Sequence, residues 1–189
     1  MRDIIIFLGP PGAGKGTQAK QLSTDKKFCH ISTGEMLRAA VATGNELGMR
    51  VKSVLDSGQL VSDDLMIELV KQRMRETDCR EGVILDGFPR TVVQAEALNK
   101  SLASSSEKIT AVIMFEVLED TVRERLSDRA KKEGRSDDSA EVQLERIRVY
   151  QTKTAPLIDF YKKSGQLQAV SAAAEIPEVY KLLKAALKY

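Results

Sequence analysis

The stretch FLGPPGAGKGTQA, residues 7–19, decides how the rest of the chain is interpreted. It places glycines, prolines and one lysine between an apolar run and a polar run that favours a helix. Glycine costs backbone entropy and proline lacks an N–H donor, so folding alone does not favour this composition. The spacing of Gly9, Gly14 and Lys15 fits the pattern G-x-x-x-x-G-K, which between a strand and a helix indicates a phosphate-binding loop.

Phosphate chemistry explains the bare backbone of this loop. A polyphosphate must approach the main chain closely enough for several N–H groups to reach its oxygens, and the helix that follows points its positive end at the anion. Lys15 adds a point charge for the outer phosphates. Gly16 stands where the common pattern has Ser or Thr, so we expect Mg²⁺ to be held through waters near Thr17 rather than by a direct hydroxyl ligand.

Composition limits the class of protein. The chain has 189 residues, which suits one domain, and its net charge of +2 is too weak a bias to indicate nucleic acid or a membrane as partner. Cys29 and Cys79 lie far apart without metal-ligand spacing, and His30 is the one histidine, so we expect neither a zinc site nor a disulfide framework. The N-terminal apolar run is too short for a signal peptide or a membrane span, which favours a cytoplasmic protein.

Hydrophobic patterning predicts an α/β fold. The runs 4–9, 82–86 and 109–117 are continuously apolar, as in strands buried on both faces of a parallel sheet, and weaker candidates surround Ile31 and Ala169. Helical patterns alternate with them, so the prediction is a doubly wound parallel sheet of about five strands. Residues 34–72 have an almost entirely helical pattern with no convincing strand. We therefore expect one domain with a core of 1–31, 73–128 and 139–189, a helical insertion of about 32–61 that extends to about 72, and a short charged loop of about 129–138.

The second motif is VILDGFPRTVVQ, residues 83–94. Asp86 ends an apolar strand, where ligands of parallel sheets gather, and a carboxylate there suits a magnesium shell. Gly87 and Pro89 predict a tight turn that presents Arg90 for bidentate phosphate binding. The N-K-x-D base reader of a guanine-nucleotide switch is missing, because Asn99-Lys100 is not followed by the aspartate.

Further candidates follow from HISTGEMLRAA, residues 30–40, and from a set of arginines. Ser32 or Thr33 is expected to cap the helix that begins near Gly34, Arg38 lies one turn further on, and His30 is expected to be a packed residue. Two nucleotides that meet phosphate to phosphate carry about six negative charges, which Lys15 and Arg90 alone would not neutralise. The additional cations are Arg125, Arg129, Arg135 and Arg146.

The motifs GPPGAGKGTQA, STGEMLRAA, GQLVSDDL, LDGFPRT with its following Gln, and GRSDD occur together in this order over essentially the whole chain. In this the chain resembles the nucleoside monophosphate kinases, most closely short-form adenylate kinases. The resemblance implies reversible, Mg²⁺-dependent transfer from ATP to AMP that gives two ADP and maintains adenine nucleotide balance. Because the region near Gly134 is only a short loop, the resemblance also implies a lid without zinc. The sequence leaves the oligomeric state open, and we expect a monomer.

The resemblance also implies a role for each matching residue. The ATP site would comprise Gly12, Ala13, Gly14, Lys15, Gly16, Thr17, Arg125, Arg129 and Ala174. The AMP site would comprise Thr33, Arg38, Gln59, Leu60, Val61, Gly87, Phe88, Pro89, Arg90, Gln94, Arg135 and Arg146. The catalytic set would be Lys15, Asp86, Arg90, Arg129, Arg135 and Arg146.

Two alternatives stay open at this point. A nucleotide-binding regulator could use the fold without turnover, although it would have no need of so many phosphate-binding arginines. A pyrimidine monophosphate kinase of the UMP/CMP type could use the same frame. Thr33 and Gln94 favour AMP as acceptor, because a glutamine amide matches the donor and acceptor edge of adenine.

Overall fold

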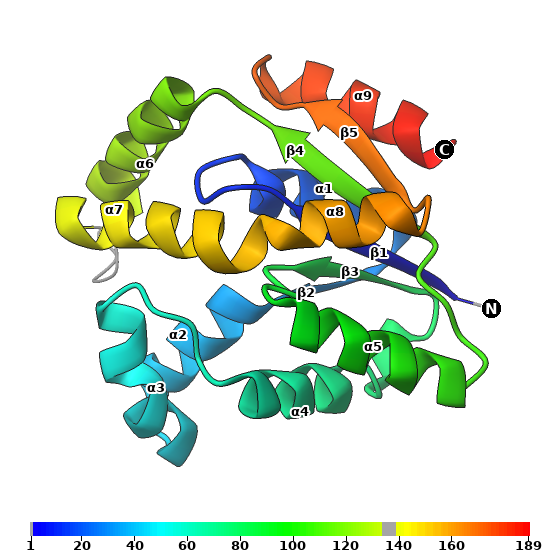
Figure 1. The fold of residues 1–189 in the computed structure, drawn as a ribbon, viewed down its shortest axis with the longest axis horizontal. Helices are drawn as coiled ribbons and strands as arrows, with labels where there is room; N and C mark the ends of the chain where they lie inside the picture. The colour runs from blue at the N-terminus through cyan, green and yellow to red at the C-terminus, as the bar shows by residue number, and fades with distance from the viewer. Residues whose placement is uncertain (1, 134–138) are drawn as a thin grey trace.

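A computed structural model describes residues 2–133 and 139–189, and it confirms the doubly wound α/β prediction (Figure 1). All strand pairs are parallel, and the sheet order is β2-β3-β1-β4-β5. The strands are β1 (Asp3–Leu8), β2 (Cys29–Ser32), β3 (Gly82–Asp86), β4 (Ala111–Glu116) and β5 (Leu167–Ser171). Because β3 and β4 flank β1 on opposite sides, the carboxyl end of β1 lies where the chain connections diverge, the usual ligand position in such sheets.

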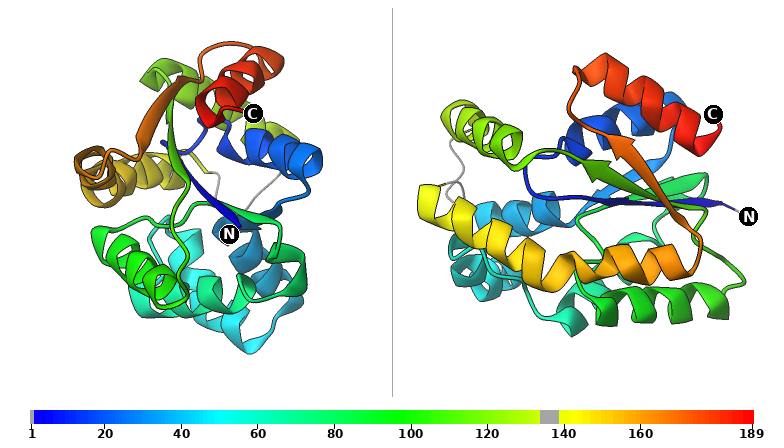
Figure 2. Two further views of the ribbon diagram at one scale, coloured as in Figure 1. Left: turned by 90° about the vertical axis from the view of Figure 1, so that its right-hand side faces the viewer. Right: turned by 45° about the horizontal axis from the view of Figure 1, so that its top comes forward.

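Helices cover both faces of the sheet (Figure 2). They are α1 (Lys15–Lys26), α2 (Thr33–Thr43), α3 (Glu46–Asp56), α4 (Asp63–Arg73), α5 (Val92–Ser104), α6 (Glu119–Glu133), α7 (Ala140–Val149), α8 (Pro156–Lys163) and α9 (Ile176–Leu187). The segment predicted to be almost entirely helical, 34–72, forms α2, α3 and most of α4 without an intervening strand, as expected. Within the described residues, no helix combines the length and apolar character that spanning a bilayer requires.

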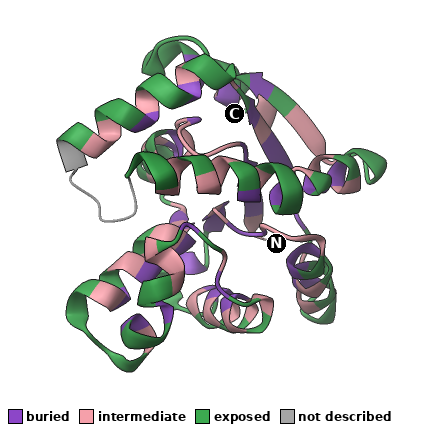
Figure 3. Cartoon of the chain, turned by 60° about the vertical axis from the view of Figure 1, so that its left-hand side comes forward, coloured by how far each residue is buried: buried purple, intermediate pink, exposed green. Residues whose placement is uncertain are grey.

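Alternating side chains of β1 feed two apolar clusters. Ile5 and Phe7 pack in one cluster with residues of α1 and α9, whereas Ile4, Ile6 and Leu8 pack in the other with residues of α5 and α8. The central strands are therefore buried on both faces, and exposed residues lie mainly on the outer helices (Figure 3). This burial explains why the strands appear in the sequence as continuous apolar runs.

The helical run near the C-terminus differs from a regular helix. A π-helical turn, Tyr150–Thr154, separates α7 from α8, and the N–H of Ala155 donates to the carbonyl of Tyr150 at 2.8 Å. Pro156 follows directly and has no N–H to continue the regular ladder, which accounts for the change of register. A short 3₁₀ turn, Thr77–Cys79, also lies outside the predicted elements.

The two cysteines, which are far apart in sequence, lie together, Cys29 on β2 and Cys79 in the 3₁₀ turn. The Sγ atoms of Cys29 and Cys79 are 2.6 Å apart, and the guanidinium of Arg73 lies 3.2 Å from the Cys79 sulfur. The same guanidinium binds both carboxylate oxygens of Asp78, at 2.8 and 2.7 Å. Burial raises the pKa of both thiols. A cation already occupies the polar side of this group, and the geometry favours a packed thiol pair.

Candidate active site

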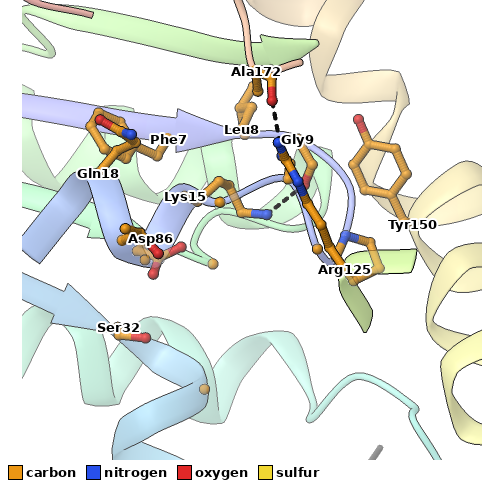
Figure 4. Close-up of a pocket in the computed structure, with 18 of the residues that line it drawn as sticks. Phe7, Leu8, Gly9, Lys15, Gln18, Ser32, Asp86, Arg125, Tyr150 and Ala172 are labelled. Atoms are coloured by element: carbon orange, nitrogen blue, oxygen red, sulfur yellow. Dashed lines mark hydrogen bonds between the residues drawn. The ribbon is translucent and has the colours of Figure 1, made fainter. Parts of the chain in front are cut away.

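A cleft of about 900 Å³ opens at the carboxyl ends of the strands (Figure 4). Its walls come from the loop after β1, from Asp86 at the end of β3, from α6 and α7, and from the turn that joins β5 to α9. The predicted phosphate loop therefore lies in the lining of this cleft. A narrower pocket, lined in part by Thr33 and Gln94, adjoins it.

The loop after β1 has the geometry of an anion site. Gly12 and Gly14 adopt φ of +82° and +85°, a left-handed conformation that glycine adopts without a Cβ penalty. Gly14 is the residue that precedes α1, so the first-turn N–H groups of this helix face the cleft end of the loop. The ammonium group of Lys15 folds back and donates to the carbonyls of Gly9 and Pro10, each at 2.8 Å.

Opposing influences act on the pKa of the Lys15 ammonium group. Burial lowers its pKa to about 8, and although the carboxylate of Asp86 opposes this shift, the cations of Arg90, Arg146 and Arg129 add to it. A phosphate that enters the cleft would supply the missing negative charge. The site is therefore electrostatically prepared for a polyanion.

Asp86 contacts His30, for which the sequence indicated no partner. The Nε2 atom of His30, on β2, lies 3.3 Å from Oδ2 of Asp86, and both side chains are nearly buried. Burial alone would raise the pKa of Asp86, but His30 and the positive charges of Lys15 and Arg90 lower it. His30 is packed, as predicted, and it also orients the carboxylate. The register of β2 and β3 places His30 opposite Ile84 and Ser32 opposite Asp86, so register alone would not have found this pair.

The absence of a side chain at Gly16 leaves space beside Asp86. A Cβ at this position would lie 3.4 Å from Oδ2 of Asp86, in ordinary contact. Thr17, one residue further, is exposed in the first turn of α1. The oxygen atoms near the phosphate loop are thus a carboxylate and an exposed hydroxyl.

The helix that follows β2 is not capped as predicted. Ser32 occupies the capping position, but its side chain makes no capping hydrogen bond. The hydroxyl of Thr33 instead donates to the carbonyl of Gly87 at 2.8 Å. The expectation that Ser32 or Thr33 caps α2 is therefore wrong, because the turn after β3 competes for the hydroxyl and ties the two predicted motifs together.

Hydrogen bonds fix the turn that carries Arg90. Its Nε donates to the carbonyl of Gly87 at 2.9 Å, and its backbone N–H donates to Oε1 of Gln94 at 2.7 Å. The hydroxyl of Thr154, in the π-helical turn, donates to the carbonyl of Arg90 at 3.0 Å. The irregular turn therefore supports the arginine from the opposite wall.

The structure brings most of the predicted site residues to the two cavities. Residues of the phosphate loop, Asp86, Pro89, Arg125, Arg129 and Ala174 line the large cleft; Thr33, Gln59, Val61 and Gln94 line the narrow pocket; Arg38, Leu60, Gly87, Arg90 and Arg146 line both. Phe88 is 2% exposed, and its side chain packs in the core rather than lining either cavity. Arg135 lies outside the described residues.

Comparison with known proteins agrees with this geometry. The family model described as adenylate kinase matches residues 7–166. Curated relatives named adenylate kinase include one from Stenotrophomonas maltophilia (strain K279a), 44% identical over 97% of this chain and 98% of the relative, and one from Caulobacter vibrioides (strain NA1000 / CB15N), 46% identical over 97% and 96%. The chain belongs to the adenylate kinase family.

This membership confirms the predicted enzyme class, ATP:AMP phosphotransfer. Neither comparison favours the pyrimidine monophosphate kinase alternative, since both the matching model and the relatives carry the adenylate kinase name. The regulator without turnover is disfavoured on the same ground.

Several contacts of this adenylate kinase were not anticipated. Nε2 of Gln59 donates to Glu145 on α7 at 2.7 Å, and Nε2 of Gln18 donates to the carbonyl of Ile176 at 3.0 Å, at the start of α9. Arg125 donates to the carbonyl of Ala172 at 2.8 Å, which places it beside the turn that contains Ala174. Asp63 contacts Gln94. These contacts join segments distant in sequence, so no local pattern indicates them.

Proposed function

We propose that this adenylate kinase binds ATP and AMP in its two cavities with their phosphates facing each other. The transferring phosphoryl group would lie between Lys15 and the arginines. The observation that carries the proposal is the set Arg38, Arg90 and Arg146, which lines both cavities at their junction. Guanidinium groups bind phosphate oxygens bidentately, and they stay charged at any physiological pH. The junction is therefore where phosphates of both nucleotides would meet the most positive charge.

The donor side of the site is the phosphate loop. Gly12, Ala13, Gly14, Lys15, Gly16 and Thr17 would hold the ATP phosphates with backbone N–H groups and the Lys15 ammonium. Arg125 and Ala174 would lie against the adenine, supported by their positions on the cleft wall next to each other. Arg129, one helical turn from Arg125, would face the phosphates.

The acceptor side is the narrow pocket. Thr33, Gln59, Leu60, Val61 and Gln94 would surround the AMP base, while Gly87, Phe88 and Pro89 would shape the turn that brings Arg90 to its phosphate. Arg135, outside the described residues, is proposed only on the resemblance. Gln94 is 2% exposed and offers an amide to the pocket, which suits a base with one donor and one acceptor on an edge.

The residues present fit Mg²⁺ bound with ATP. Asp86 is a carboxylate with a lowered pKa at the cleft floor, and Thr17 adds an exposed hydroxyl. Magnesium favours oxygen ligands and commonly takes one or two protein groups together with substrate phosphates and waters. We propose that Asp86 and Thr17 hold it through waters. When bound, the ion would neutralise charge on the ATP phosphates.

No general base is required. The attacking oxygen belongs to the AMP phosphate, which is already ionised near neutral pH, so the protein has to align two phosphates, neutralise charge and exclude water. The proposal thus explains why the single histidine, His30, orients Asp86 instead of acting on substrate.

Acceptor choice tests the proposal. With ATP and a panel of monophosphates, AMP should exceed UMP and CMP by at least about a hundredfold in kcat/KM, because a site built for hydrogen bonds rejects ligands that leave them unpaired. Thr33→Ala with Gln94→Ala should narrow that gap, mainly through loss of AMP activity. Comparable wild-type rates with UMP or CMP would refute the acceptor assignment.

We further propose that one chain suffices for activity. Every residue assigned to the site belongs to the same chain, and the described ones other than Phe88 line cavities within it. A monomer in the cytoplasm that handles ATP, AMP and ADP, without nucleic acid or membrane partners, is consistent with this arrangement. Activity that is proportional to protein concentration across the range in which sedimentation shows a monomer would support it.

A further inference from the structure

Asp63, the first residue of α4, makes contacts that the proposed function does not use. Its Oδ1 atom accepts two hydrogen bonds, from Nε2 of Gln94 at 2.8 Å and from the hydroxyl of Thr91 at 3.0 Å. Asp63 lines neither cavity, and of its two hydrogen-bond donors only Gln94 lines a cavity. We infer that Asp63 is a positioning residue that fixes the amide of Gln94 in one orientation and thereby sets which purine the acceptor site prefers.

The amide of Gln94 is held at both ends. Its Oε1 accepts from the backbone N–H of Arg90 at 2.7 Å, while its Nε2 donates to Asp63. An amide turned by 180° would direct its NH₂ group at a donor and its oxygen at a carboxylate, which accepts but does not donate when ionised. Asp63 therefore excludes the turned amide from one side as the Arg90 N–H excludes it from the other.

Thr91 strengthens this arrangement. Its oxygen accepts from the backbone N–H of Gln94 at 3.2 Å, and its hydroxyl hydrogen is then directed at Asp63. The Asp63 carboxylate thus accepts hydrogen bonds both from Thr91, the cap residue of α5, and from Gln94, whose side chain α5 presents to the pocket. Because Gln94 is 2% exposed, water does not replace a lost partner easily.

Orientation of the amide determines what it offers a ligand. With one N–H and one lone pair already used, Gln94 keeps one donor and one acceptor for the pocket. Adenine carries an amino donor at position six, whereas hypoxanthine carries an oxygen acceptor there. A fixed amide can match only one of these patterns, so AMP and IMP are the natural pair of probes. The inference rests on the proposed acceptor site, in which Gln94 faces the base.

The experiment compares Asp63→Ala with Asp63→Asn and with Asp64→Ala, each assayed with ATP and either AMP or IMP. Asp64 is an exposed acid in the same first turn of α4 and serves as the matched control. For Asp63→Ala we expect KM for AMP to rise about tenfold and kcat to stay within about twofold, since a buried amide loses one partner. KM for ATP should not change, and the AMP-to-IMP ratio of kcat/KM should fall about tenfold.

Asp63→Asn keeps an oxygen that can accept both hydrogen bonds, so its KM for AMP should stay within about threefold of wild type. Asp64→Ala should match wild type in every parameter. Equal losses with AMP and IMP in Asp63→Ala, or an Asp63→Asn variant as impaired as Asp63→Ala, would reduce Asp63 to a structural residue and overturn the inference. Should Asp63→Ala not fold, Asp63→Ser, which suits a helix N-terminus but is too short to reach both donors, takes its place in the same comparison.

The Gln94→Ala variant distinguishes failure of the proposed acceptor site from failure of the positioning role of Asp63. If it leaves the AMP-to-IMP ratio unchanged, the proposed acceptor site is wrong. If it lowers the ratio while Asp63→Ala does not, the acceptor site stands and only the positioning role fails.

Discussion

At the scale of single residues, Lys15 connects the sequence motif to the chemistry. Its ammonium donates to two carbonyls of its own loop, and its pKa is lowered to about 8 by burial. The motif predicted that a cation stands here, but it could not predict the pKa, because the buried surroundings and the neighbouring Arg90, Arg129 and Arg146 come from distant segments. Because the pKa of Lys15 is close to neutral pH, a bound phosphate would stabilise the charged form of the lysine.

This balance predicts an alkaline limb in the pH profile. The charged form of Lys15 binds phosphate, so kcat/KM for ATP, which reports the free enzyme, should fall about tenfold per pH unit above pH about 8. The kcat at saturation should hold to higher pH, because bound phosphates raise the lysine pKa. Product formation measured by chromatography between pH 7 and pH 10 avoids the pH dependence of coupling enzymes.

Lys15→Met supplies the control for this profile. Loss of a charged phosphate contact in a dry site should lower kcat/KM by about a hundredfold or more, and the residual activity should lack the alkaline limb. A folded Lys15→Met protein with near-normal turnover would show that Lys15 is not the catalytic cation. A wild-type profile that stays flat to pH 9.5 would show that the free lysine keeps its usual pKa.

At the scale of elements, the sequence was most informative where burial or bare backbone dictates composition. The apolar runs indicated β1, β3 and β4 to within a residue or two, since strands buried on both faces consist mainly of apolar residues. The cap of α2 was missed because the carbonyl of Gly87, which tertiary structure brings close, accepts the hydroxyl hydrogen of Thr33. The π-helical turn was missed because the pattern around Pro156 does not show how the backbone before a proline changes register.

The packing of α2 against α3 gives a prediction at this scale. Gly48, on α3, is buried, and a Cβ there would lie 2.0 Å from the carbonyl oxygen of Ala40 on α2. Gly48→Ala should therefore lower the free energy of unfolding by about 3 kcal/mol, since backbone must move to relieve the overlap. Thermal denaturation should show Tm lower by about 6–12 °C.

Met49→Ala is the neighbouring control, because Met49 is 70% exposed and its loss should change stability by no more than about 0.5 kcal/mol. A Gly48→Ala protein as stable as wild type would mean that α2 and α3 can separate without cost. That outcome would weaken the view of these helices as one packed unit.

At the scale of the whole molecule, the segment between α3 and α4 contacts α7. A Cβ at Gly58 would lie 3.1 Å from the carbonyl of Val142, and Gln59 donates to Glu145. The sequence predicted an insertion and a phosphate loop but not this seam, because nothing in either segment encodes the position of the other. These contacts link residues 58–59 to α7, the helix that also carries Arg146.

Water exclusion predicts that the two sides of the cleft respond together. A bisubstrate analogue, in which a polyphosphate joins two adenosines, should slow amide exchange both in 34–72 and in 129–138, the second of which lies partly outside the described residues.

AMP alone should protect mainly the first segment, and ATP alone mainly the second, because each nucleotide contacts one side of the proposed site. The physical reason is that phosphoryl transfer to water must be suppressed while both substrates are bound, so closure is useful only when both sides have engaged. Exchange that is unchanged in both segments with the analogue bound at saturation would show that the cleft of about 900 Å³ stays open during catalysis, and water would then have to be excluded by the substrates themselves.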